Sequence, residues 1–342
     1  MNTKTLVPII FSFLFFSCNT SIQKQPENDL SEKGLKGNVK FYKETKYKPI
    51  ETLGKIEKGH AINIAETNFN NEGNLIDQRF FSYETNFTSK TIYSYNEKGS
   101  LIKVVEEYGK NGELKRRNRT YNYDKKEKLI EEKWYNKEKK IESKRTYNYD
   151  KKGNLIEESY WSDEGNFIYQ TTYYIYDNKG NLIENYSKGE KLKGRIKNTY
   201  EYDEKGNEIE GIFYFNGIEE RKWYNRYDEK ENLIEEEAFL FKGENVDKAF
   251  SYRTTHKYDT KGNIIETISY SGESVEWKEY FKYNEEGNLV EKISFDNLYK
   301  NFEDNSTQIF YNKYDEKGNW TEMIEFTFSS PDLIIEREIE YY

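Results

Sequence analysis

An acidic residue recurs at one position of a repeated segment, and this is the pattern in the sequence with the most evident chemical potential. Stacked carboxylates are hard oxygen ligands for cations. Equivalent strands of successive repeats would be separated by another strand, so about 9.5 Å would divide these carboxylates, which is too far for shared coordination. We therefore expect them to pair with lysine, arginine and threonine on the intervening strands. The row comprises Glu131, Glu157, Glu184, Glu210, Glu235, Glu266, Glu291 and Glu322.

Histidine occurs only at His60 and His256. His256 occupies a position that is tyrosine in other copies of the repeat, so we expect a packed ring, whereas His60 has no recognisable partner. A metal site or a histidine-based catalytic set needs clustered groups that this pattern lacks. The sequence also contains no Gly-x-Ser-x-Gly elbow, no phosphate-binding glycine loop and no His-Glu-x-x-His motif. We predict no catalytic residue, no metal and no cofactor.

The tryptophans are the candidates for ligand binding. With the surrounding tyrosines they would form stacking platforms for sugars if they were exposed at even spacing. They also fall on predicted strands, where aromatic rings are the expected packing material, and packing is the favoured interpretation. The five are Trp134, Trp161, Trp223, Trp277 and Trp320.

All these side chains belong to a segment that is present in ten copies between Phe69 and Tyr314. Each copy places Asp or Asn after an aromatic residue, and eight copies place glycine three positions later, which fits a type I turn closed by a residue with positive φ. Glu127 and Glu231 stand at the other two positions, where we expect strain and the least regular hairpins. The eight turn glycines are Gly73, Gly99, Gly153, Gly180, Gly206, Gly262, Gly287 and Gly318.

Leucine and then isoleucine, or a similar apolar residue, follow the turns, with Glu208 as the outlier in the first row and Thr321 in the second. An apolar row therefore leaves the turn on each face of a strand. A second, less regular turn, such as Asn216-Gly217, lies between these turns. Two turns in about 27 residues leave room for two strands of ordinary length. The sequence thus predicts a long antiparallel meander of β-hairpins.

The run from Thr146 to Leu155, Thr-Tyr-Asn-Tyr-Asp-Lys-Lys-Gly-Asn-Leu, resembles the YD repeat of the Rhs family. The resemblance covers roughly residues 60–330. It implies an all-β fold in which antiparallel hairpins pair edge to edge into an open, curved or spiralling sheet, which large members close around a toxin. No carboxy-terminal toxin domain is recognisable here. A β-propeller is the alternative, because two repeats supply the four strands of a blade.

The amino-terminal residues have the features of a secretory signal. The apolar stretch from Leu6 to Phe16 is shorter than a membrane span needs, and Cys18, the only cysteine, follows Ser17 as in a lipobox. We therefore predict a lipoprotein signal peptide at residues 1–17, lipidation of Cys18, a flexible tether at 18–33 and a repeat domain at 34–342. A chance cysteine beside an ordinary signal cleavage site is the alternative. Residues 49–59 are expected to be irregular.

The net charge of −9 argues against a nucleic-acid partner, since phosphate binding needs a basic surface. We expect a non-catalytic lipoprotein of the bacterial outer membrane, either periplasmic or surface-exposed, that acts as a scaffold or binding module for a protein or surface partner. A carbohydrate or cell-wall binding module and an immunity or inhibitor lipoprotein are the alternatives. A glycoside hydrolase, which would need two carboxylates in a cleft, is the least favoured.

Overall fold

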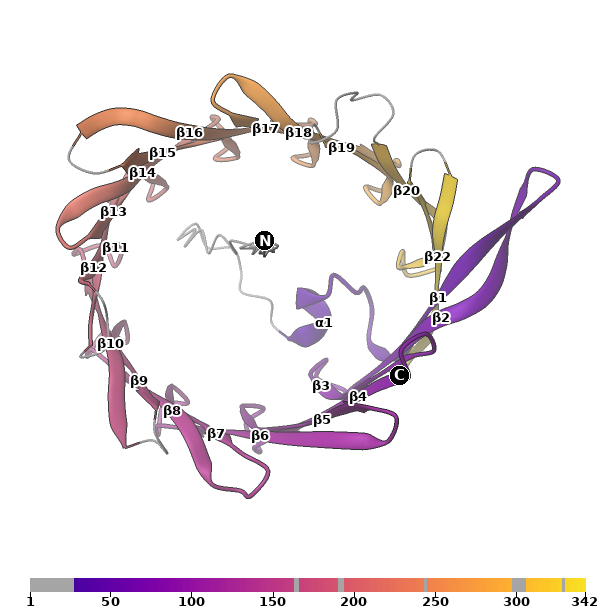
Figure 1. The fold of residues 1–342 in the computed structure, drawn as a ribbon, viewed down its shortest axis with the longest axis horizontal. Coiled ribbons are helices and arrows are strands. Elements are labelled where there is room, and N and C mark those ends of the chain that lie inside the picture. The colour runs from indigo at the N-terminus through magenta and orange to yellow at the C-terminus, as the bar shows by residue number, and fades with distance from the viewer. Residues whose placement is uncertain (1–27, 163–165, 190–193, 243–244, 297–305, 328–329) are drawn as a thin grey trace, which may run out of the picture.

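The protein is a closed antiparallel β-barrel (Figure 1). The computed structural model describes residues 28–162, 166–189, 194–242, 245–296, 306–327 and 330–342. Within these residues a single sheet of 22 strands follows one short helix. The predicted signal peptide at residues 1–17 and the predicted lipidation site Cys18 lie outside the described residues.

The strands are consecutive along the chain, and each pairs with the strands before and after it. The elements are α1 (Asp29–Glu32), β1 (Val39–Thr52), β2 (Lys55–Phe69), β3 (Leu75–Ser82), β4 (Phe87–Tyr95), β5 (Leu101–Lys110), β6 (Glu113–Tyr123), β7 (Leu129–Tyr135), β8 (Ile141–Tyr149), β9 (Leu155–Ser162), β10 (Phe167–Tyr176), β11 (Leu182–Lys188), β12 (Ile196–Tyr202), β13 (Glu208–Phe215), β14 (Ile218–Tyr227), β15 (Leu233–Lys242), β16 (Asn245–Tyr258), β17 (Ile264–Ser271), β18 (Ser274–Tyr283), β19 (Leu289–Asp296), β20 (Ser306–Tyr314), β21 (Trp320–Thr327) and β22 (Ser330–Tyr341).

The first and last strands close the barrel. β1 pairs antiparallel with β22, from Val39 opposite Tyr341 to Tyr47 opposite Ile334. The predicted open, spiralling sheet is therefore wrong, and so is the propeller, because the strands form one continuous ring without separate blades. Closure satisfies the backbone groups that an open sheet would leave unpaired at its two edges.

The repeated turns share one hydrogen-bond pattern. In the turn of Asp203, the backbone amide of Asp203 donates to the carbonyl of Asn207 at 2.9 Å, and that of Gly206 donates to the carbonyl of Asp203. The Asp203 carboxylate accepts from the amides of Lys205 and Asn207. All eight turn glycines have positive φ. The short acid therefore organises the turn, and glycine closes it.

Glu127 and Glu231 adopt the same conformation as the glycines, with φ of 60° and 68°. Their turns keep the shared hydrogen bonds, from Asp124 to Lys128 and from Asp228 to Asn232. The expectation that these hairpins are the least regular is wrong.

A tyrosine hydroxyl joins each repeat from Tyr123 onwards to the one before it. Tyr149 donates to the carbonyl of Leu129 at 2.8 Å, and Tyr202 donates to that of Leu182 at 2.8 Å. This bond explains why the repeat has tyrosine beside its turn, where phenylalanine would fill the same space. The further donors are Tyr123, Tyr176, Tyr227, Tyr258, Tyr283 and Tyr314.

The two faces of the wall are set by a bulge at each turn. Helix α1 lies inside the ring (Figure 1), and its Leu30 packs against Phe69 and Leu75. These two residues pair across β2 and β3, so the leucine row and the repeat aromatics face the lumen. The register shifts beside this pair, between Asn68 and Phe69, and such a shift inserts an extra residue. The isoleucine and acidic rows therefore both face outwards.

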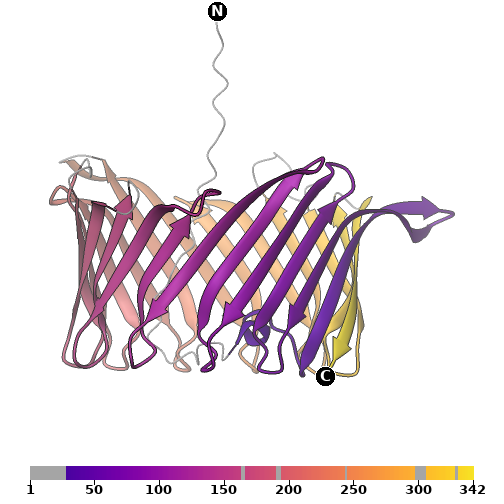
Figure 2. The same ribbon diagram turned by 90° about the horizontal axis from the view of Figure 1, so that it is seen from below.

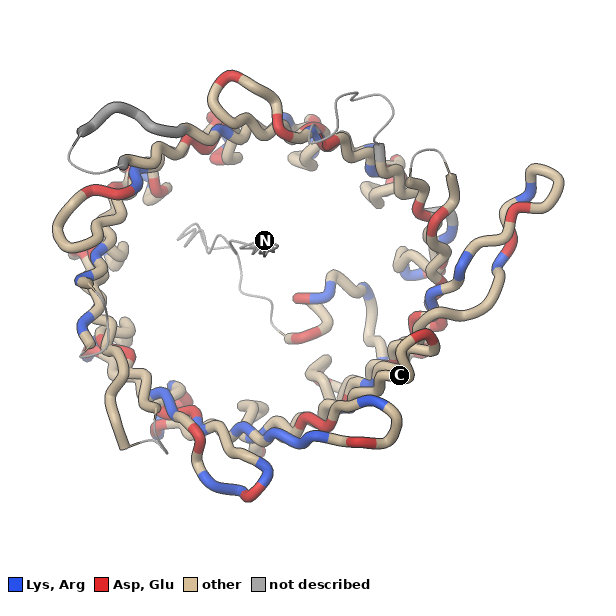
Figure 3. Tube along the Cα trace, viewed as in Figure 1, with Lys and Arg blue, Asp and Glu red and all other residues tan. Residues whose placement is uncertain are grey.

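The outer wall is charged around the ring. Six of the eight acidic residues of the row meet a polar partner nine residues earlier, on the preceding strand, as Lys257 Nζ meets Glu266 at 2.6 Å and Lys313 Nζ meets Glu322 at 2.8 Å. Glu184 and Glu210 instead meet Lys197 and Lys222 on the following strand. Figure 3 shows acidic and basic residues interleaved along the wall. The outward isoleucines are partly exposed, as Ile156 is at 38%.

The amino-terminal part departs from the prediction in two places. Residues 28–33 do not form a flexible tether, because α1 packs in the lumen and the Leu30 amide donates to the carbonyl of Gly73 at 3.1 Å. Residues 49–59 are not irregular, since β1 and β2 continue there as a hairpin that projects beyond the barrel (Figure 2). Among the described residues, α1 is a single turn, and no helix has the length and apolar character of a membrane span.

Candidate functional site

The ten repeats can be compared with one another, position by position. The residues on strands β13 to β16 depart most strongly from the shared pattern. The leucine after the turn is replaced by Glu208, and the tyrosine two residues before the repeat aromatic is replaced by Asn225 and then by His256. All three replaced positions face the lumen by the register of the wall. Because these three polar replacements fall on neighbouring strands and face the lumen, this sector is the candidate functional site.

Trp223 occupies the centre of this sector. It pairs with Gly211 on the neighbouring strand, and its indole covers this glycine so closely that a β-carbon at position 211 would collide with the ring. The indole nitrogen donates to the Glu208 carboxylate at 2.7 Å. The ring of Tyr200 meets the indole edge-on, with centroids 6.0 Å apart. The indole is thus fixed along the lumen wall.

Glu208 is held in place by several bonds. Glu208 is only 8% exposed. Burial raises the pKa of its carboxyl, whereas the hydrogen bond from Trp223 lowers it. Its backbone carbonyl accepts from Asn225 Nδ2 at 3.1 Å and from the Tyr227 hydroxyl at 3.0 Å. Burial also raises the pKa of Tyr227 to about 12. Glu208 is therefore held in place by its neighbours, and its carboxylate fixes the position of the Trp223 indole.

His256 extends the polar edge of the site. Its Nδ1 lies 3.1 Å from the Thr267 hydroxyl, and its Nε2 lies 3.8 Å from the Glu236 carboxylate. The ring is 14% exposed and lies in the lumen row, as predicted for a packed ring. His60 lies on β2 and is exposed. In the described parts of the chain, no group of acidic, histidine or cysteine side chains is arranged to hold a metal.

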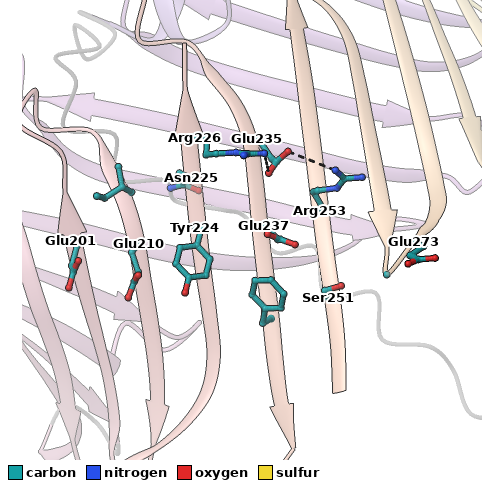
Figure 4. A pocket seen from close by; sticks show the side chains of 13 residues that line it. Glu201, Glu210, Tyr224, Asn225, Arg226, Glu235, Glu237, Ser251, Arg253 and Glu273 are labelled. Atoms are coloured by element: carbon teal, nitrogen blue, oxygen red, sulfur yellow. Dashed lines mark hydrogen bonds and ion pairs between the residues drawn. The ribbon is translucent and has the colours of Figure 1, made fainter. Parts of the chain in front are cut away.

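The outer side of the same sector has an open depression of about 950 Å³ (Figure 4). Arg253 lies 3.9 Å from Glu235, which also pairs with Arg226. Tyr224 and Phe239 supply apolar surface and meet edge-on. The remaining lining carboxylates make the depression acidic; they are Glu201, Glu210, Glu237 and Glu273.

The other tryptophans are engaged by their neighbours. Trp134 lies in the lumen between two guanidinium groups, with Arg119 at 5.4 Å and Arg145 at 5.6 Å from the ring centroid. Trp161 faces outwards, and its nitrogen donates to the Thr146 hydroxyl at 3.1 Å.

Trp277 and Trp320 also face the lumen. Trp277 pairs with Ser269, and the Arg337 guanidinium lies 3.4 Å from the ring centroid of Trp320. The five tryptophans therefore lie on both faces and form no evenly spaced row. Trp223 differs from the other four because a glycine on the neighbouring strand makes room for it.

No protein-family model matches the sequence, and no curated protein sequence matches it. Solved structures that match this chain include the TcdB2-TccC3 complex (12% identity, 84% of this chain and 18% of that chain, TM-score 0.38) and the TcdB2-TccC3-Cdc42 complex (12%, 87% and 19%, TM-score 0.33). A porin-like protein from Bacteroides uniformis matches at 10% identity over 88% of this chain and 98% of that chain, with a TM-score of 0.34.

This chain spans about a fifth of the length of the TcdB2-TccC3 chains that it matches. Identities and TM-scores this low carry no functional conclusion, and membership of the YD-repeat family stays a prediction. The function is therefore inferred from the residues of this chain.

Sequence reasoning named Trp223 and noticed Glu208 and His256 as exceptions to the repeat, but it did not connect them. The role of Gly211 was missed. The available signal was a glycine in the interior of a predicted strand, which often marks a close approach by another group.

Proposed function

We propose that this protein is a non-catalytic lipoprotein of the bacterial outer membrane whose barrel stands in water and binds its partner through the lumen sector around Trp223. A large closed β-barrel is an architecture of the outer membrane, so the fold agrees with the outer-membrane association expected from the sequence. Lipidation at Cys18 and the binding role are parts of the proposal.

The charged outer wall is the observation that carries the proposal. A barrel that spans a membrane presents an apolar band about 25 Å tall to lipid, and one lysine or arginine at the midplane costs about 2–4 kcal/mol. Here the outward rows bear ion pairs such as Lys257–Glu266 and Lys313–Glu322 on strand after strand. Water on both faces of the wall accounts for this pattern, and a lipid at Cys18 would then hold the barrel at the membrane.

Two measurements test the water-exposed barrel and its anchor. Residues 28–342 should be soluble and monodisperse without detergent, and their circular dichroism should show β-structure. The full chain should incorporate a fatty-acid label and sediment with outer membranes, and both properties should be lost in Cys18→Ala. A barrel that aggregates until detergent is added would overturn the proposal.

Binding is tested in cells by photo-cross-linking from the lumen sector. A cross-linker at Asn225 should capture a partner, and one at Ile175, which lies on the outer wall with 42% exposure, is the matched control. Equal capture from both positions would contradict a lumen site. The identity of the captured partner would also separate a scaffold from an immunity or inhibitor lipoprotein.

Glycoside hydrolysis is a second candidate, favoured by two lumen carboxylates. Glu208 and Glu236 lie two strands apart, or about 9.5 Å, and inverting glycosidases hold their carboxyl groups about 6.5–9.5 Å apart. Glu208 is nevertheless buried and accepts from Trp223, which favours positioning of the indole. Release of shorter sugars from oligosaccharides by the wild-type barrel, absent in Glu236→Gln, would establish catalysis and replace the binding role.

A further inference from the structure

We propose that one rim of the barrel docks on an anionic phospholipid membrane, through exposed apolar side chains and basic residues in the turns from β1 to β10. This end, the hairpin rim, holds the turns that join each odd-numbered strand to the next even-numbered one, and the repeat turns lie at the opposite end (Figure 2). The inference rests on the proposed function, because it states how a barrel held by a lipid at Cys18 would contact that membrane.

The first observation is the residue at the tip of the β1–β2 hairpin. Leu53 has a φ of 51° and is 100% exposed. Asn111 and Asn216 precede the turn glycine in two other hairpins, with φ of 52° and 55°, and asparagine tolerates this conformation better than leucine does. In the part of the chain that the structure describes, the other non-glycine residues with positive φ are all polar or charged. Leu53 therefore buries no surface in the barrel, and contact with an apolar environment outside it would account for this side chain.

The second observation is the position of this hairpin. Its pairing with β22 ends at Tyr47 and its pairing with β3 ends at Asn63. The ribbon extends past these neighbouring strands and projects sideways at the level of the hairpin rim (Figure 2). A flat surface that meets this rim would therefore reach Leu53 as well.

Further exposed apolar side chains lie on the same rim. They belong to separate hairpins: Tyr83 follows β3, Leu114 is the second residue of β6 and is 59% exposed, and Ile168 is the second residue of β10. Apolar side chains spread over several turns at one level suit insertion into a flat boundary, because a single protein pocket could not receive them together. They therefore point to a membrane surface.

Charge distinguishes the two ends of the barrel. Segments 110–117 and 136–140, which contain the β5–β6 and β7–β8 turns, hold seven basic and two acidic residues, and Figure 3 shows the basic residues on these two hairpins. The ten repeat turns at the opposite end hold sixteen acidic and ten basic residues. An anionic surface would therefore attract this part of the hairpin rim and repel the other end.

Anionic phospholipid satisfies both features of the rim. Surfaces that bind at a bilayer boundary place apolar side chains about 5–10 Å below the headgroups and leave lysine and arginine beside the phosphates. Leu53 and Leu114 supply the first group, and the turns of β5 to β8 supply the second. A lipid at Cys18 would keep the rim close to the membrane, so that weak individual contacts suffice for docking.

The test uses the predicted mature chain, residues 18–342, as Cys18→Ala, so that no lipid anchor contributes. Vesicles of phosphatidylethanolamine with phosphatidylglycerol are the anionic probe, and vesicles of phosphatidylcholine are the neutral one. Co-sedimentation gives the apparent Kd. We expect saturable binding to the anionic vesicles that weakens as salt is added, and weaker binding to the neutral ones.

Leu53→Asn should weaken binding to the anionic vesicles about tenfold, because it removes an apolar side chain from the tip. It should fold as well as its parent does, since asparagine is the residue that Asn111 and Asn216 place at this turn position. Ile175→Thr is the matched control, because Ile175 lies on the outer wall beside a repeat turn. This control should leave the apparent Kd unchanged.

Lys139→Glu tests the contribution of charge. Lys139 has a φ of 63°, and glutamate adopts the same conformation at Glu127 and Glu231, so the β7–β8 turn should keep its shape. The exchange of a positive for a negative charge should weaken binding to the anionic vesicles about tenfold. Binding to the neutral vesicles should not change.

A dye at the tip tests insertion itself. The chain has no cysteine besides Cys18, so Leu53→Cys in the Cys18→Ala chain provides a single thiol for an environment-sensitive fluorophore. Its emission should shift to shorter wavelength with the anionic vesicles. The same dye attached through Ile175→Cys should show no shift.

Three results would overturn the inference: no binding of the parent chain to the anionic vesicles, binding that is unchanged in both Leu53→Asn and Lys139→Glu, or a cross-linker at Leu53 that captures a protein in cells while vesicles are not bound. The last result would make the rim a protein interface. Lipid labelling at Cys18 and capture from Asn225 do not depend on the rim, so the proposed function would stand or fall separately.

Discussion

The carboxylate of Glu127 lies 2.7 Å from the ammonium group of Lys98 on the preceding repeat turn, and it also accepts from Ser100 and Asn96 there. Glu127 stands where most repeats have glycine, with φ of 60°. A positive φ is unfavourable for a residue with a side chain, so the bonds between turns offset local strain. Glu231 repeats the arrangement with Lys205 at 3.3 Å.

Replacement of Glu127 by Gln should destabilise the barrel in a pH-dependent way. The hydrogen bonds from Lys98, Ser100 and Asn96 lower the pKa of Glu127 to about 2. A carboxyl whose pKa is lowered on folding stabilises the folded state at pH values above its unfolded pKa. This stabilisation is lost as the pH falls through the folded pKa. The urea midpoint of Glu127→Gln should therefore be lower than that of wild type at pH 7, and the two should converge near pH 2. A difference of the same size at both pH values would contradict this account.

Removal of the Tyr202 hydroxyl should weaken the link between successive repeats. Tyr202→Phe deletes the bond to the Leu182 carbonyl and should cost about 1 kcal/mol in the free energy of unfolding, measured by urea titration. Tyr169→Phe is the control, because Tyr169 contacts Tyr160 through its ring, which phenylalanine retains. Equal losses in the free energy of unfolding in the two variants would show that the hydrogen bond from Tyr202 adds no stability.

The closing seam should be sensitive to the loss of buried volume. Ile335 of β22 is 5% exposed and pairs with both β1 and β21. Ile335→Ala should lower the free energy of unfolding by about 2–4 kcal/mol, whereas Ile175→Ala on the exposed outer wall should change it by about 0.5 kcal/mol or less. Urea titration of both variants measures the contrast. Similar losses would mean that β22 contributes no more to stability than the outer wall does.

Neutralisation of Glu208 should stabilise the barrel at neutral pH. Burial raises its pKa in the folded protein, so the charged form is disfavoured there and wild-type stability falls as pH rises above the unfolded value of about 4.5. Glu208→Gln keeps an acceptor for the Trp223 nitrogen without the charge. Its urea midpoint should exceed that of wild type at pH 7 and approach it at pH 4. A lower midpoint at pH 7 would show that the ionised carboxylate stabilises the site.

The hairpins could be predicted from the sequence because their determinants are local. Asp203 and Gly206, three residues apart, define a turn, and ten such turns define a meander. Closure could not be predicted, since it depends on how small rotations between neighbouring strands accumulate before Val39 meets Tyr341. The site around Trp223 could not be predicted for a related reason. Its position opposite Gly211 depends on a register that the bulges shift at the turns.

The pairing of β1 with β22 also has a consequence for biosynthesis. Val39 and Tyr341 are 302 positions apart in the chain (341 − 39), so β1 emerges from the ribosome long before its partner exists. Until β22 arrives, one long edge of β1 is an open template for another strand. Such late, long-range pairing is slow and leaves intermediates prone to aggregation. The growing chain therefore depends on protection of β1 until β22 has been made, and the pairing of this last strand ends the exposure of the β1 edge.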